Sequence, residues 1–461
     1  MSTPLHVLTL QSATTGVLTS PTPDGYALAP QTLTPCPISA EHMQLALKHS
    51  KTYNRMMYLA KKKFSTWLKP HLMATSTSDP EFTGKLLSLA DFILSNSPSS
   101  YETPVLCVMR SDYMLDTSSN PGPKLVEYNT IASSFGCLST KLAKVHETLN
   151  KTFSLNQNIA SNNATDKIVG GLSACCSLDG VIVMVVQPGE RNLFDQGVIE
   201  LEVIKRGRKI VRMSLDQICN DSALDAASNV LTIKINGADV PVECVYFRAG
   251  YDPSDYKSSD DWEGRKKLEL CTAIKCPDVF GQLFGAKKIQ QILTIKEERE
   301  KLYEGEEEEY KAQQEGVEDT WVKMWDLKDF DSIVKMVQSA EENTSFVLKP
   351  QREGGGNNVY GDDVLGHLKA LKEEERDGWV LMETIVAEKF NNTLVKEGKV
   401  AYAGVCSAEI GIFGVTCFDS EGSDRIDDEG KQGYICRCKR EGVDEGGVAA
   451  GFAFLSSIQL V

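Results

Sequence analysis

Residues 349–358 read KPQREGGGNN, and this stretch decides the fold that we predict for the chain. A short apolar run, Phe346 to Leu348, precedes it and is typical of a buried strand, while a helical pattern follows from Asp362 to about Arg376. Glycine lets main-chain N–H groups approach phosphates, lysine supplies a positive charge, and glutamate is a hard oxygen ligand for Mg²⁺. The stretch therefore indicates a polyphosphate and metal site, but a charged hairpin tip with glycines in left-handed turns would have the same letters.

The composition excludes several classes of protein. The 461 residues are enough for two or three domains, and 41% hydrophobic with 25% charged residues is ordinary for a globular protein. The net charge of -15 argues against nucleic acid or an anionic membrane as a partner. The longest purely apolar run, Val181 to Val186, is too short to cross a bilayer.

The cysteines and the first residues favour a cytoplasmic protein. None of the first 47 residues is Lys or Arg, which argues against a secretory n-region and an Arg-rich transit peptide. The 13 cysteines are scattered along a chain too large to need a disulfide framework, and the six histidines supply no matching metal-site spacing. We therefore expect buried free thiols in a reducing cytosol.

Helices dominate the first part of the predicted fold. Apolar residues recur at helical spacing in two segments, 40–68 and 86–94. Two strands and another helix follow, at 105–108, 124–128 and 138–149. These helices are expected to cover a sheet.

A compact α/β domain is predicted from 177 to 285. It begins with a strand, a helix and a second strand, at 181–186, 193–204 and 209–213, and a further strand lies at 242–247. This alternation is typical of a βαβ unit with a parallel sheet. Ligands bind at the loops that follow such strands, and the first of these loops is Gln187 to Arg191.

The last part of the chain is predicted to contain one further sheet. Its strands are expected at 346–349, 380–383 and 400–409, with helices between them. The Glu- and Lys-rich segment 296–314 is expected to be an exposed, partly mobile helix or loop.

Two oxygen-bearing side chains end the strand at 124–128. Glu127 and Asn129 are two residues apart, so they project to the same side. Together with Glu353 they would offer the oxygen-rich coordination that Mg²⁺ prefers. The alternative is a strand end whose asparagine bonds the following turn.

Three arginines, Arg110, Arg248 and Arg437, each stand at or just after a predicted strand. The planar guanidinium grips a carboxylate in a bidentate way, so the three would suit a substrate with several carboxylates. Each also fits an ordinary salt bridge.

A second small-residue stretch, GGVAAG at 446–451, would form a mobile lid over a reactive intermediate or pack closely against a strand. The chain has no GxSxG, GxxxxGK[ST], HExxH or kinase HRD/DFG motif. A phosphate and Mg²⁺ site beside carboxylate-gripping arginines suits ATP-driven activation of a carboxylate.

Ten motifs make the chain resemble a known family. They are RSDYM (110–114), EYNTIASSFG (127–136), ERNLFDQ (190–196), YFRAGY (246–251), KCPD (275–278), AKKIQQ (286–291), KPQREGGGNNVYG (349–361), LMETI (381–385), EIGIFG (409–414) and GGVAAG (446–451). In these motifs and in their order, the chain resembles the eukaryotic-type glutathione synthetases from about residue 100 to its end.

The resemblance implies an ATP-grasp fold, in which ATP lies between two α+β parts. It implies an N-terminal helical part with the first portion of the core (1–176), an inserted parallel α/β substrate-binding domain (177–285) and a nucleotide-binding part (286–461). Family members join γ-glutamylcysteine to glycine at the expense of ATP, through an acylphosphate. The resemblance further implies two Mg²⁺ ions per site and a cytoplasmic homodimer.

Carried over motif by motif, the resemblance assigns roles to residues of this chain. The metal ligands are Glu127, Asn129 and Glu353. The nucleotide-binding residues are Lys287, Lys349, Gly354, Gly355, Gly356, Asn357, Asn358, Tyr360, Met382, Glu383, Thr384, Ile385, Glu409 and Lys439. The peptide- and glycine-binding residues are Arg110, Ser133, Ser134, Glu190, Arg191, Asn192, Gln196, Arg248, Tyr251, Arg437, Val448 and Ala449. Arg110, Arg437 and Glu353 are expected to act directly in catalysis.

Four departures from the family pattern, Ala132, Ala249, Thr384 and Glu445, affect fine substrate contacts. None removes a predicted metal ligand or phosphate lysine. Three alternatives remain: a ligase of the same family that accepts another amine such as β-alanine, a non-catalytic nucleotide-binding relative, and a scaffold that recruits partners through 296–314.

Overall fold

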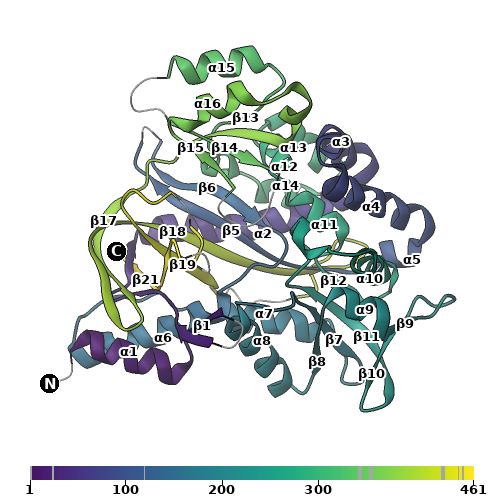
Figure 1. Ribbon diagram of the computed structural model, residues 1–461, viewed down its shortest axis with the longest axis horizontal. Coiled ribbons are helices and arrows are strands. Elements are labelled where there is room, and N and C mark those ends of the chain that lie inside the picture. Colours follow the sequence, from purple (N-terminus) through teal and green to yellow (C-terminus); the bar gives the residue numbers. More distant parts are fainter. Residues whose placement is uncertain are drawn as a thin grey trace.

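A mixed sheet of 13 strands runs through the molecule, and a separate four-stranded sheet lies above it in Figure 1. The structure is a computed structural model and describes residues 3–22, 25–118, 120–340, 345–351, 357–426, 431–444, 446–448 and 451–461. The strands of the large sheet are β3 (Gln31–Thr32), β5 (Val105–Asp116), β6 (Gly122–Asn129), β7 (Val181–Val185), β8 (Lys209–Met213), β9 (Ser222–Leu224), β10 (Leu231–Ile235), β11 (Ala238–Phe247), β12 (Ile274–Cys276), β17 (Lys389–Lys396), β18 (Lys399–Phe418), β19 (Tyr434–Arg440) and β20 (Phe454–Ser456).

The smaller sheets have five residues or fewer in each strand. The four-stranded sheet has the order β13 (Met324–Asp326), β16 (Trp379–Glu383), β14 (Phe346–Pro350) and β15 (Val359–Tyr360). Two strand pairs are β1 (Leu18–Thr22) with β2 (Gly25–Leu28), and β4 (Cys36–Ile38) with β21 (Ile458–Leu460). The last pair holds the C-terminal segment against the N-terminal part of the chain.

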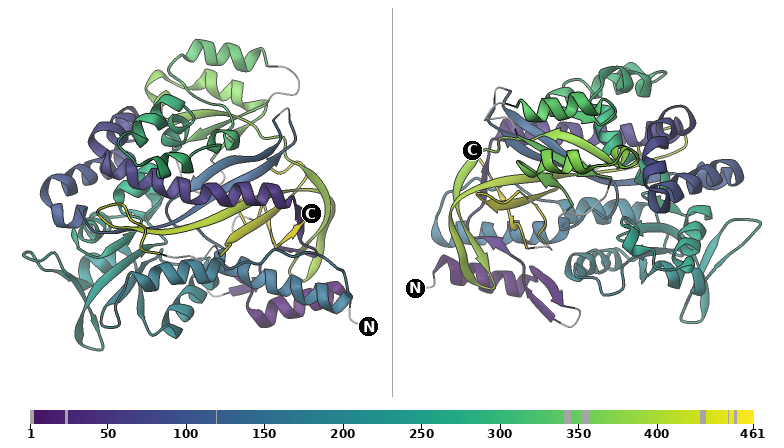
Figure 2. Two further views of the ribbon diagram at one scale, coloured as in Figure 1. Left: turned by 180° about the vertical axis from the view of Figure 1, so that it is seen from behind. Right: turned by 45° about the horizontal axis from the view of Figure 1, so that its top comes forward.

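Helices cover both faces of the large sheet (Figure 2). The longer helices are α1 (Pro4–Thr15), α2 (Ala40–Lys62), α3 (Lys69–Ser78), α4 (Lys85–Asn96), α6 (Gly136–Phe153), α7 (Ala164–Ala174), α8 (Leu193–Lys205), α10 (Ser259–Leu270), α13 (Lys296–Tyr303), α15 (Phe330–Gln338) and α16 (Asp363–Ala370). The shorter ones are α5 (Pro98–Tyr101), α9 (Leu215–Asp221), α11 (Val279–Phe284), α12 (Lys287–Leu293) and α14 (Glu308–Gln313). A π-helical turn, Phe64–Leu68, continues α2.

Burial explains why α2 lies across the large sheet, on the face turned toward the viewer in the left view of Figure 2. Its second half is buried on all sides, with Tyr53, Met56 and Met57 at 0–1% exposure, because β5 and β18 pack against it in one hydrophobic cluster. Helices α6 and α7 cover the other face of the same strands. The predicted helices over 40–68, 86–94 and 138–149 are confirmed.

The βαβ unit predicted after residue 177 is confirmed. Strands β7 and β8 run parallel on either side of α8, with Val181 opposite Lys209. Strand β11 also runs parallel to β7, whereas β9 and β10 extend the sheet in antiparallel fashion. Because β12 joins this unit to β5, the sheet continues into the rest of the chain. The domain boundaries at 176 and 285 stay a prediction.

Two expectations for the last part were wrong. Segment 400–409 does not share a sheet with 346–349 and 380–383, because it belongs to β18, which pairs with β5 of the large sheet over ten residues. The helix expected from Asp362 to Arg376 ends at Ala370 and is followed by a 3-10 turn, Glu373–Gly378. Three consecutive exposed glutamates there supply no apolar face to continue the helix. In the 296–314 segment, Leu302 and Tyr303 are buried.

A buried histidine predicts how stability depends on pH. His146 of α6 is 1% exposed, and its ring nitrogens contact the Ser457 hydroxyl at 2.7 Å and the Thr32 carbonyl at 3.0 Å. Burial lowers the pKa of His146 to about 4, so the unfolded chain takes up this proton first. We expect the free energy of unfolding to fall by about 3 kcal/mol through this group as the pH drops from 6.5 to 4.

Denaturant unfolding across this pH range measures the effect. The variant His146→Gln should show the shallower pH dependence, while His6→Gln, at an exposed position of α1, should match the wild type. Equal slopes in the wild type and His146→Gln would contradict the expectation.

Candidate active site

Alternation along β5 and β6 places four polar side chains on one face of the large sheet. Arg110 and Asp112 are two residues apart on β5 and therefore share a face. The pairing register sets Asn129 of β6 opposite Arg110 and Glu127 opposite Asp112. The pairing then skips Val126, an irregularity of the β-bulge kind. The Val126 carbonyl accepts a hydrogen bond from Lys349 Nζ at 2.9 Å, so the bulge joins β6 to the four-stranded sheet.

Strands β18 and β19 continue the same face on the other side of β5. Gly411 of β18 stands opposite Asp112, and Glu409 of β18 stands opposite Arg437 of β19. Lys439 lies two residues beyond Arg437 and shares its face. Four neighbouring strands thus bring together charged residues that are up to 330 positions apart in the chain.

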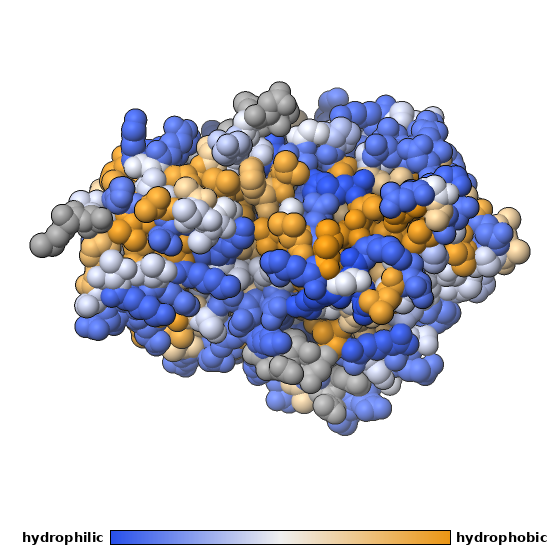
Figure 3. Space-filling model, turned by 90° about the horizontal axis from the view of Figure 1, so that it is seen from below, coloured by the Kyte–Doolittle hydropathy of each residue, from blue (hydrophilic) through white to orange (hydrophobic). Residues whose placement is uncertain are grey.

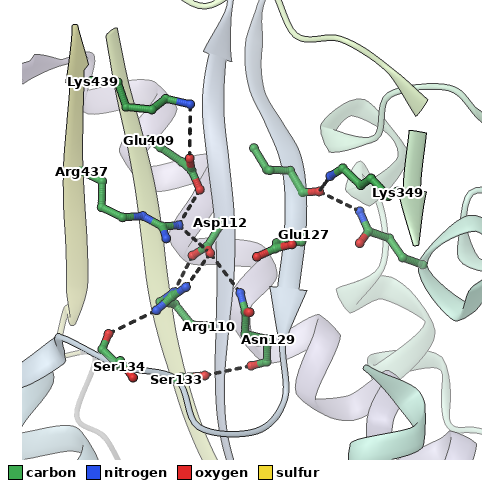
Figure 4. Close-up of polar contacts among 12 residues, drawn as sticks. Arg110, Asp112, Glu127, Asn129, Ser133, Ser134, Lys349, Glu409, Arg437 and Lys439 are labelled. Atoms are coloured by element: carbon green, nitrogen blue, oxygen red, sulfur yellow. Dashed lines mark hydrogen bonds and ion pairs between the residues drawn. The ribbon is translucent and has the colours of Figure 1, made fainter. Parts of the chain in front are cut away.

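Asp112 is the centre of this cluster (Figure 4). Its side chain has no exposed surface, and Arg110 donates to it twice, from Nε at 2.7 Å and from Nη2 at 2.8 Å. Arg437 Nη2 donates to Asp112 Oδ2 at 2.7 Å, and Asn129 Nδ2 donates to the same oxygen at 3.0 Å. Arg110 Nη1 also donates to the Ser134 carbonyl at 3.2 Å.

Arg437 bridges two carboxylates. Its Nη2 contacts Glu409 as well as Asp112, and Lys439 Nζ lies 3.7 Å from the other Glu409 oxygen. Burial alone would lower the pKa of the Arg437 guanidinium, but Glu409 and Asp112 outweigh burial and raise it. The guanidinium is therefore a permanent buried cation.

Two lysines, Lys287 and Lys349, lie near Glu127, and Figure 4 shows Lys349 on the side of the cleft facing Glu127. Lys287 Nζ lies 2.9 Å from Glu127 Oε2, and the Glu127 side chain is 26% exposed. Burial opposes ionisation of this carboxyl, but Lys287 and Lys349 outweigh burial and hold the pKa of Glu127 well below its ordinary value. Glu127 is thus an ionised oxygen donor.

A cleft of about 500 Å³ separates the two sheets at this point. Its wall includes fourteen residues to which the sequence assigned a metal, nucleotide or catalytic role: Arg110, Glu127, Asn129, Lys287, Lys349, Asn358, Tyr360, Met382, Glu383, Thr384, Ile385, Glu409, Arg437 and Lys439. A second cavity of about 400 Å³, near Ser78, His367 and Trp379, contains none of them among the described residues.

Two other predicted peptide-binding residues, Arg248 and Ser134, lie next to the cleft. Arg248 follows the carboxyl end of β11, as expected, and donates to Asp195 at 3.3 Å and to the Ser134 hydroxyl at 2.8 Å. Asp195 accepts from three main-chain N–H groups at the start of α6. Because Ser134 contacts both Arg248 and Arg110, it joins this group to the cleft.

Most of the remaining predicted substrate residues lie in or near the loop after β7. Gln196 Nε2 donates to Glu190 at 2.7 Å, and the main-chain N–H of Asn192 donates to the same carboxylate at 2.7 Å. Tyr251 accepts from Gln187 at 3.4 Å. Ser133 is buried and donates to the Asn129 carbonyl, Val448 is buried near the C-terminal stretch, and Arg191 is exposed.

The sequence is similar to known proteins over nearly its whole length. Residues 5–460 match the family model described as eukaryotic glutathione synthase, ATP binding domain. The chain belongs to this family. It is 34% identical to glutathione synthetase of Rattus norvegicus, over 94% of this chain and 90% of the relative. It is 32% identical to the glutathione synthetase large chain of Schizosaccharomyces pombe, over 94% and 91%.

A plant relative and a solved structure are also similar to this chain. The chloroplastic glutathione synthetase of Solanum lycopersicum is 33% identical, over 94% of this chain and 78% of the relative. In fold, the chain is similar to a glutathione synthetase-like effector from Globodera pallida in its apo form, with a TM-score of 0.76, 17% identity and coverage of 99% and 96%. These findings confirm the predicted α/β fold class. In the described part of the chain, no helix has the length and apolar character needed to cross a bilayer.

Five residues that the family motifs singled out lie outside the described residues: Glu353, Gly354, Gly355, Gly356 and Ala449. Asn357, at the edge of this gap, is exposed. The roles given to all these residues stay predictions.

The placement of two arginines differs from the expectation. Arg110 and Arg437 lie in the middle of β5 and β19, not at strand ends. Strand β5 continues to Asp116, well past the apolar run 105–108 that predicted it, and no bounds were predicted for β19. Sequence analysis also missed Asp112 and Asp195. Both lie inside quoted motifs, and the spacing of Asp112 two residues after Arg110 would have placed them on one face.

The side-chain oxygen atoms of Glu127 and Asn129 are suited to bind Mg²⁺. Glu127 is ionised, and Asn129 uses its amide nitrogen on Asp112, which leaves its amide oxygen as the atom suited to a hard cation. Among the described residues, no group of three His, Cys, Asp or Glu side chains forms a metal site. Two metal ligands on β6, with Glu353 as the predicted third, would leave the other coordination positions of Mg²⁺ to phosphate oxygens and water, which is how proteins usually bind this ion.

Gly411 predicts a packing effect. A Cβ at this position would lie 2.3 Å from Asp112 Oδ1, 2.7 Å from Ile435 and 2.8 Å from Arg110 Cδ. We expect Gly411→Ala to lower the free energy of unfolding by about 1–3 kcal/mol through overpacking. In α16, a Cβ at Gly366 meets nothing within 4 Å, so Gly366→Ala should stabilise by about 0.5–1 kcal/mol. Chemical denaturation measures both effects. If Gly411→Ala leaves the free energy of unfolding unchanged, the side chains of Asp112, Ile435 and Arg110 can move to accommodate the added methyl group.

Proposed function

We propose that the protein is a glutathione synthetase: it joins γ-glutamylcysteine to glycine and converts ATP to ADP and phosphate. The observation that carries the proposal is the single cleft in which three buried lysines, an ionised glutamate and two buried arginines meet. Its chemistry suits the ATP-dependent synthesis of glutathione, after which the family and its curated relatives are named.

The nucleotide would lie between the two sheets. Lys349, Lys287 and Lys439, all 3–5% exposed, project into the cleft where phosphates would need positive charge. Met382 and Ile385 offer the apolar wall for a base. The predicted lid residues Gly446 and Gly447 also line this cleft.

Glu127 and Asn129 would hold Mg²⁺, and the family resemblance predicts two ions. When bound, Mg²⁺ neutralises negative charge on the phosphate oxygens. Lys287, which now contacts Glu127, would then be available for a phosphate.

Arg110 and Arg437 would orient the dipeptide beside the nucleotide. The C-terminal carboxylate of γ-glutamylcysteine attacks the γ-phosphorus, which gives an acylphosphate and ADP. The amine of glycine then attacks the acyl carbon, and the C–O bond to phosphate breaks, so that an amide, phosphate and a proton are formed. Exclusion of water by the closed cleft protects the acylphosphate.

The chain is also proposed to act as a homodimer in a reducing compartment. All 13 cysteines have free thiols, and twelve of them are buried.

Hydrophobic side chains gather in bands on the face seen in Figure 3. Leu201 and Ile204 of α8, which are 60% and 56% exposed, are candidates for a subunit contact. Light scattering of the purified protein, with Leu201→Asp as the test variant, measures the oligomeric state.

ADP release tests the ligase directly. Purified protein is mixed with Mg·ATP, γ-glutamylcysteine and glycine, each component is left out in turn, and the product is identified by mass. Release that needs every component and yields glutathione supports the proposal. ADP release that needs β-alanine in place of glycine would show that the ligase makes a different product. ATP binding without ADP release under any condition would overturn the assignment as an enzyme.

A further inference from the structure

We propose that Asp112 is a positioning residue that holds Arg110, Arg437 and Asn129 in a fixed arrangement. In this way it couples the arginines that would bind the substrate carboxylates to the amide that would face the metal. The proposal deepens the proposed ligase function and rests on it. Asp112 itself is too enclosed to touch substrate, since its exposure is 0%. It acts through the three residues that do line the cleft.

The hydrogen bonds of Asp112 leave little capacity for another role. An ionised carboxylate offers about four lone-pair positions and no donor. Here Oδ1 accepts from Arg110 Nε, and Oδ2 accepts from Arg110 Nη2, Arg437 Nη2 and Asn129 Nδ2. Four donors therefore occupy these positions, and each donor belongs to a residue of the cleft wall. Asp112 is neither a metal ligand nor a base in this arrangement.

The bond to Asp112 also decides how Arg110 can meet a substrate. The Nε and Nη2 edge of its guanidinium is taken by Asp112, and Nη1 contacts the Ser134 carbonyl. A substrate oxygen can therefore reach Arg110 only at the outer, Nη1 and Nη2 edge. The sequence left open whether the Arg110 guanidinium binds a substrate or forms a salt bridge, and in the structure its Nε and Nη2 edge pairs with an internal carboxylate.

The surrounding backbone is shaped for this carboxylate. Gly411 stands opposite Asp112 in the register, and any side chain there would collide with Asp112 and Arg110. On the other side, the β-bulge falls next to the pair formed by Asp112 and Glu127. The space left by Gly411 of β18 and the β-bulge of β6 thus fix the position of the Asp112 carboxylate between these two strands.

The contacts of the two buried arginines explain why the positioning needs a carboxylate at Asp112. Arg110 and Arg437 are 7% and 8% exposed, and Asp112 and Glu409 are the carboxylates that contact them. In the isosteric variant Asp112→Asn, an amide N–H₂ would face arginine donors. We expect Arg437 to retreat to Glu409 and the Asn129 amide to lose its acceptor, so both the arginine and the metal-facing oxygen would move.

The test compares Asp112→Asn and Asp112→Glu with the wild type and with Glu269→Gln. Glu269 is 2% exposed and pairs with buried Arg265 in α10, which makes it a matched buried carboxylate outside the cleft. For each protein, thermal unfolding, kcat, KM for γ-glutamylcysteine, and the Mg²⁺ concentration for half-maximal binding of a non-hydrolysable ATP analogue are measured.

A positioning role predicts a specific pattern. Asp112→Asn should have a kcat at least 100-fold lower and a half-maximal Mg²⁺ concentration at least tenfold higher, with an unfolding temperature no lower than that of Glu269→Gln. Asp112→Glu, which keeps the charge but moves it by one methylene, should fold and still show both defects. If Asp112→Asn does not fold, Asp112→Glu is decisive by itself.

Other outcomes overturn the proposal. Asp112 would be a purely structural residue if either folded variant lost stability but kept kcat and the Mg²⁺ dependence of analogue binding. If the wild type releases no ADP, the ligase function fails; the Mg²⁺-dependent binding of the analogue still reads the positioning of Asn129, and an unchanged value would then reject the role of Asp112.

Discussion

Replacement of Arg437 by glutamine is expected to lower kcat/KM by about 1000-fold, which corresponds to about 4 kcal/mol of transition-state stabilisation. The guanidinium bridges Asp112 and Glu409, which are 0% and 5% exposed. Removal of the cation leaves two buried carboxylates without this partner. We therefore also expect the free energy of unfolding to fall by about 3–5 kcal/mol.

Steady-state kinetics and denaturant unfolding measure these two effects. Arg437→Lys is the informative companion, because a lysine keeps the charge but lacks the length and the planar geometry with which Nη2 of the guanidinium contacts both carboxylates. It should recover most of the stability and little of the activity. As a control, Arg425→Gln breaks an exposed ion pair with Asp419 and should change neither quantity measurably. An Arg437→Gln enzyme with more than a tenth of the wild-type kcat/KM would contradict the role of the bridge.

Replacement of Glu127 by glutamine is the second large effect that we expect. The change keeps the shape but removes the charge that Lys287 and Lys349 stabilise. An amide is a weaker ligand for a hard cation than a carboxylate, and the two lysines would repel the metal without the negative charge between them. We expect kcat to fall by roughly 100-fold and the Mg²⁺ concentration for half-maximal activity to rise at least tenfold.

A Mg²⁺ titration of ADP release measures this change. Glu81→Gln, at a side chain that is 82% exposed and pairs with Lys85 outside the cleft, is the control and should show the wild-type titration. If Glu127→Gln has an unchanged Mg²⁺ dependence, Glu127 serves only to neutralise Lys287, and the metal is held elsewhere.

Much of the site could be predicted because its residues carry their chemistry locally. The spacing of Glu127 and Asn129 predicted two oxygen donors on one side of a strand, and both line the cleft. The apolar run before Lys349 predicted β14, which delivers that lysine to the cleft. The periodicity of residues 181–213 predicted the parallel βαβ unit, because alternation and helical spacing are properties of short segments.

The errors have one common cause, which is that strand partners are chosen at long range. The apolar run 105–108 predicted only the start of β5, whose polar half, from Arg110 to Asp116, is a strand because β6 and β18 supply hydrogen bonds on either side. In the same way, residues 400–409 looked like a partner of 380–383, but β18 extends to Phe418 and pairs with β5 and β19.

By itself, the sequence determined which residues carry charge, which segments form helices and strands, and which side chains of one strand share a face. Only the tertiary structure decided that β6, β5, β18 and β19 lie side by side, and that Asp112 therefore receives donors from Arg110, Asn129 and Arg437. The physical reason is that face and period are fixed by local backbone geometry, whereas the register between strands as far apart in the chain as β5 and β18, where Val105 pairs with Phe418, is set by packing of the whole core.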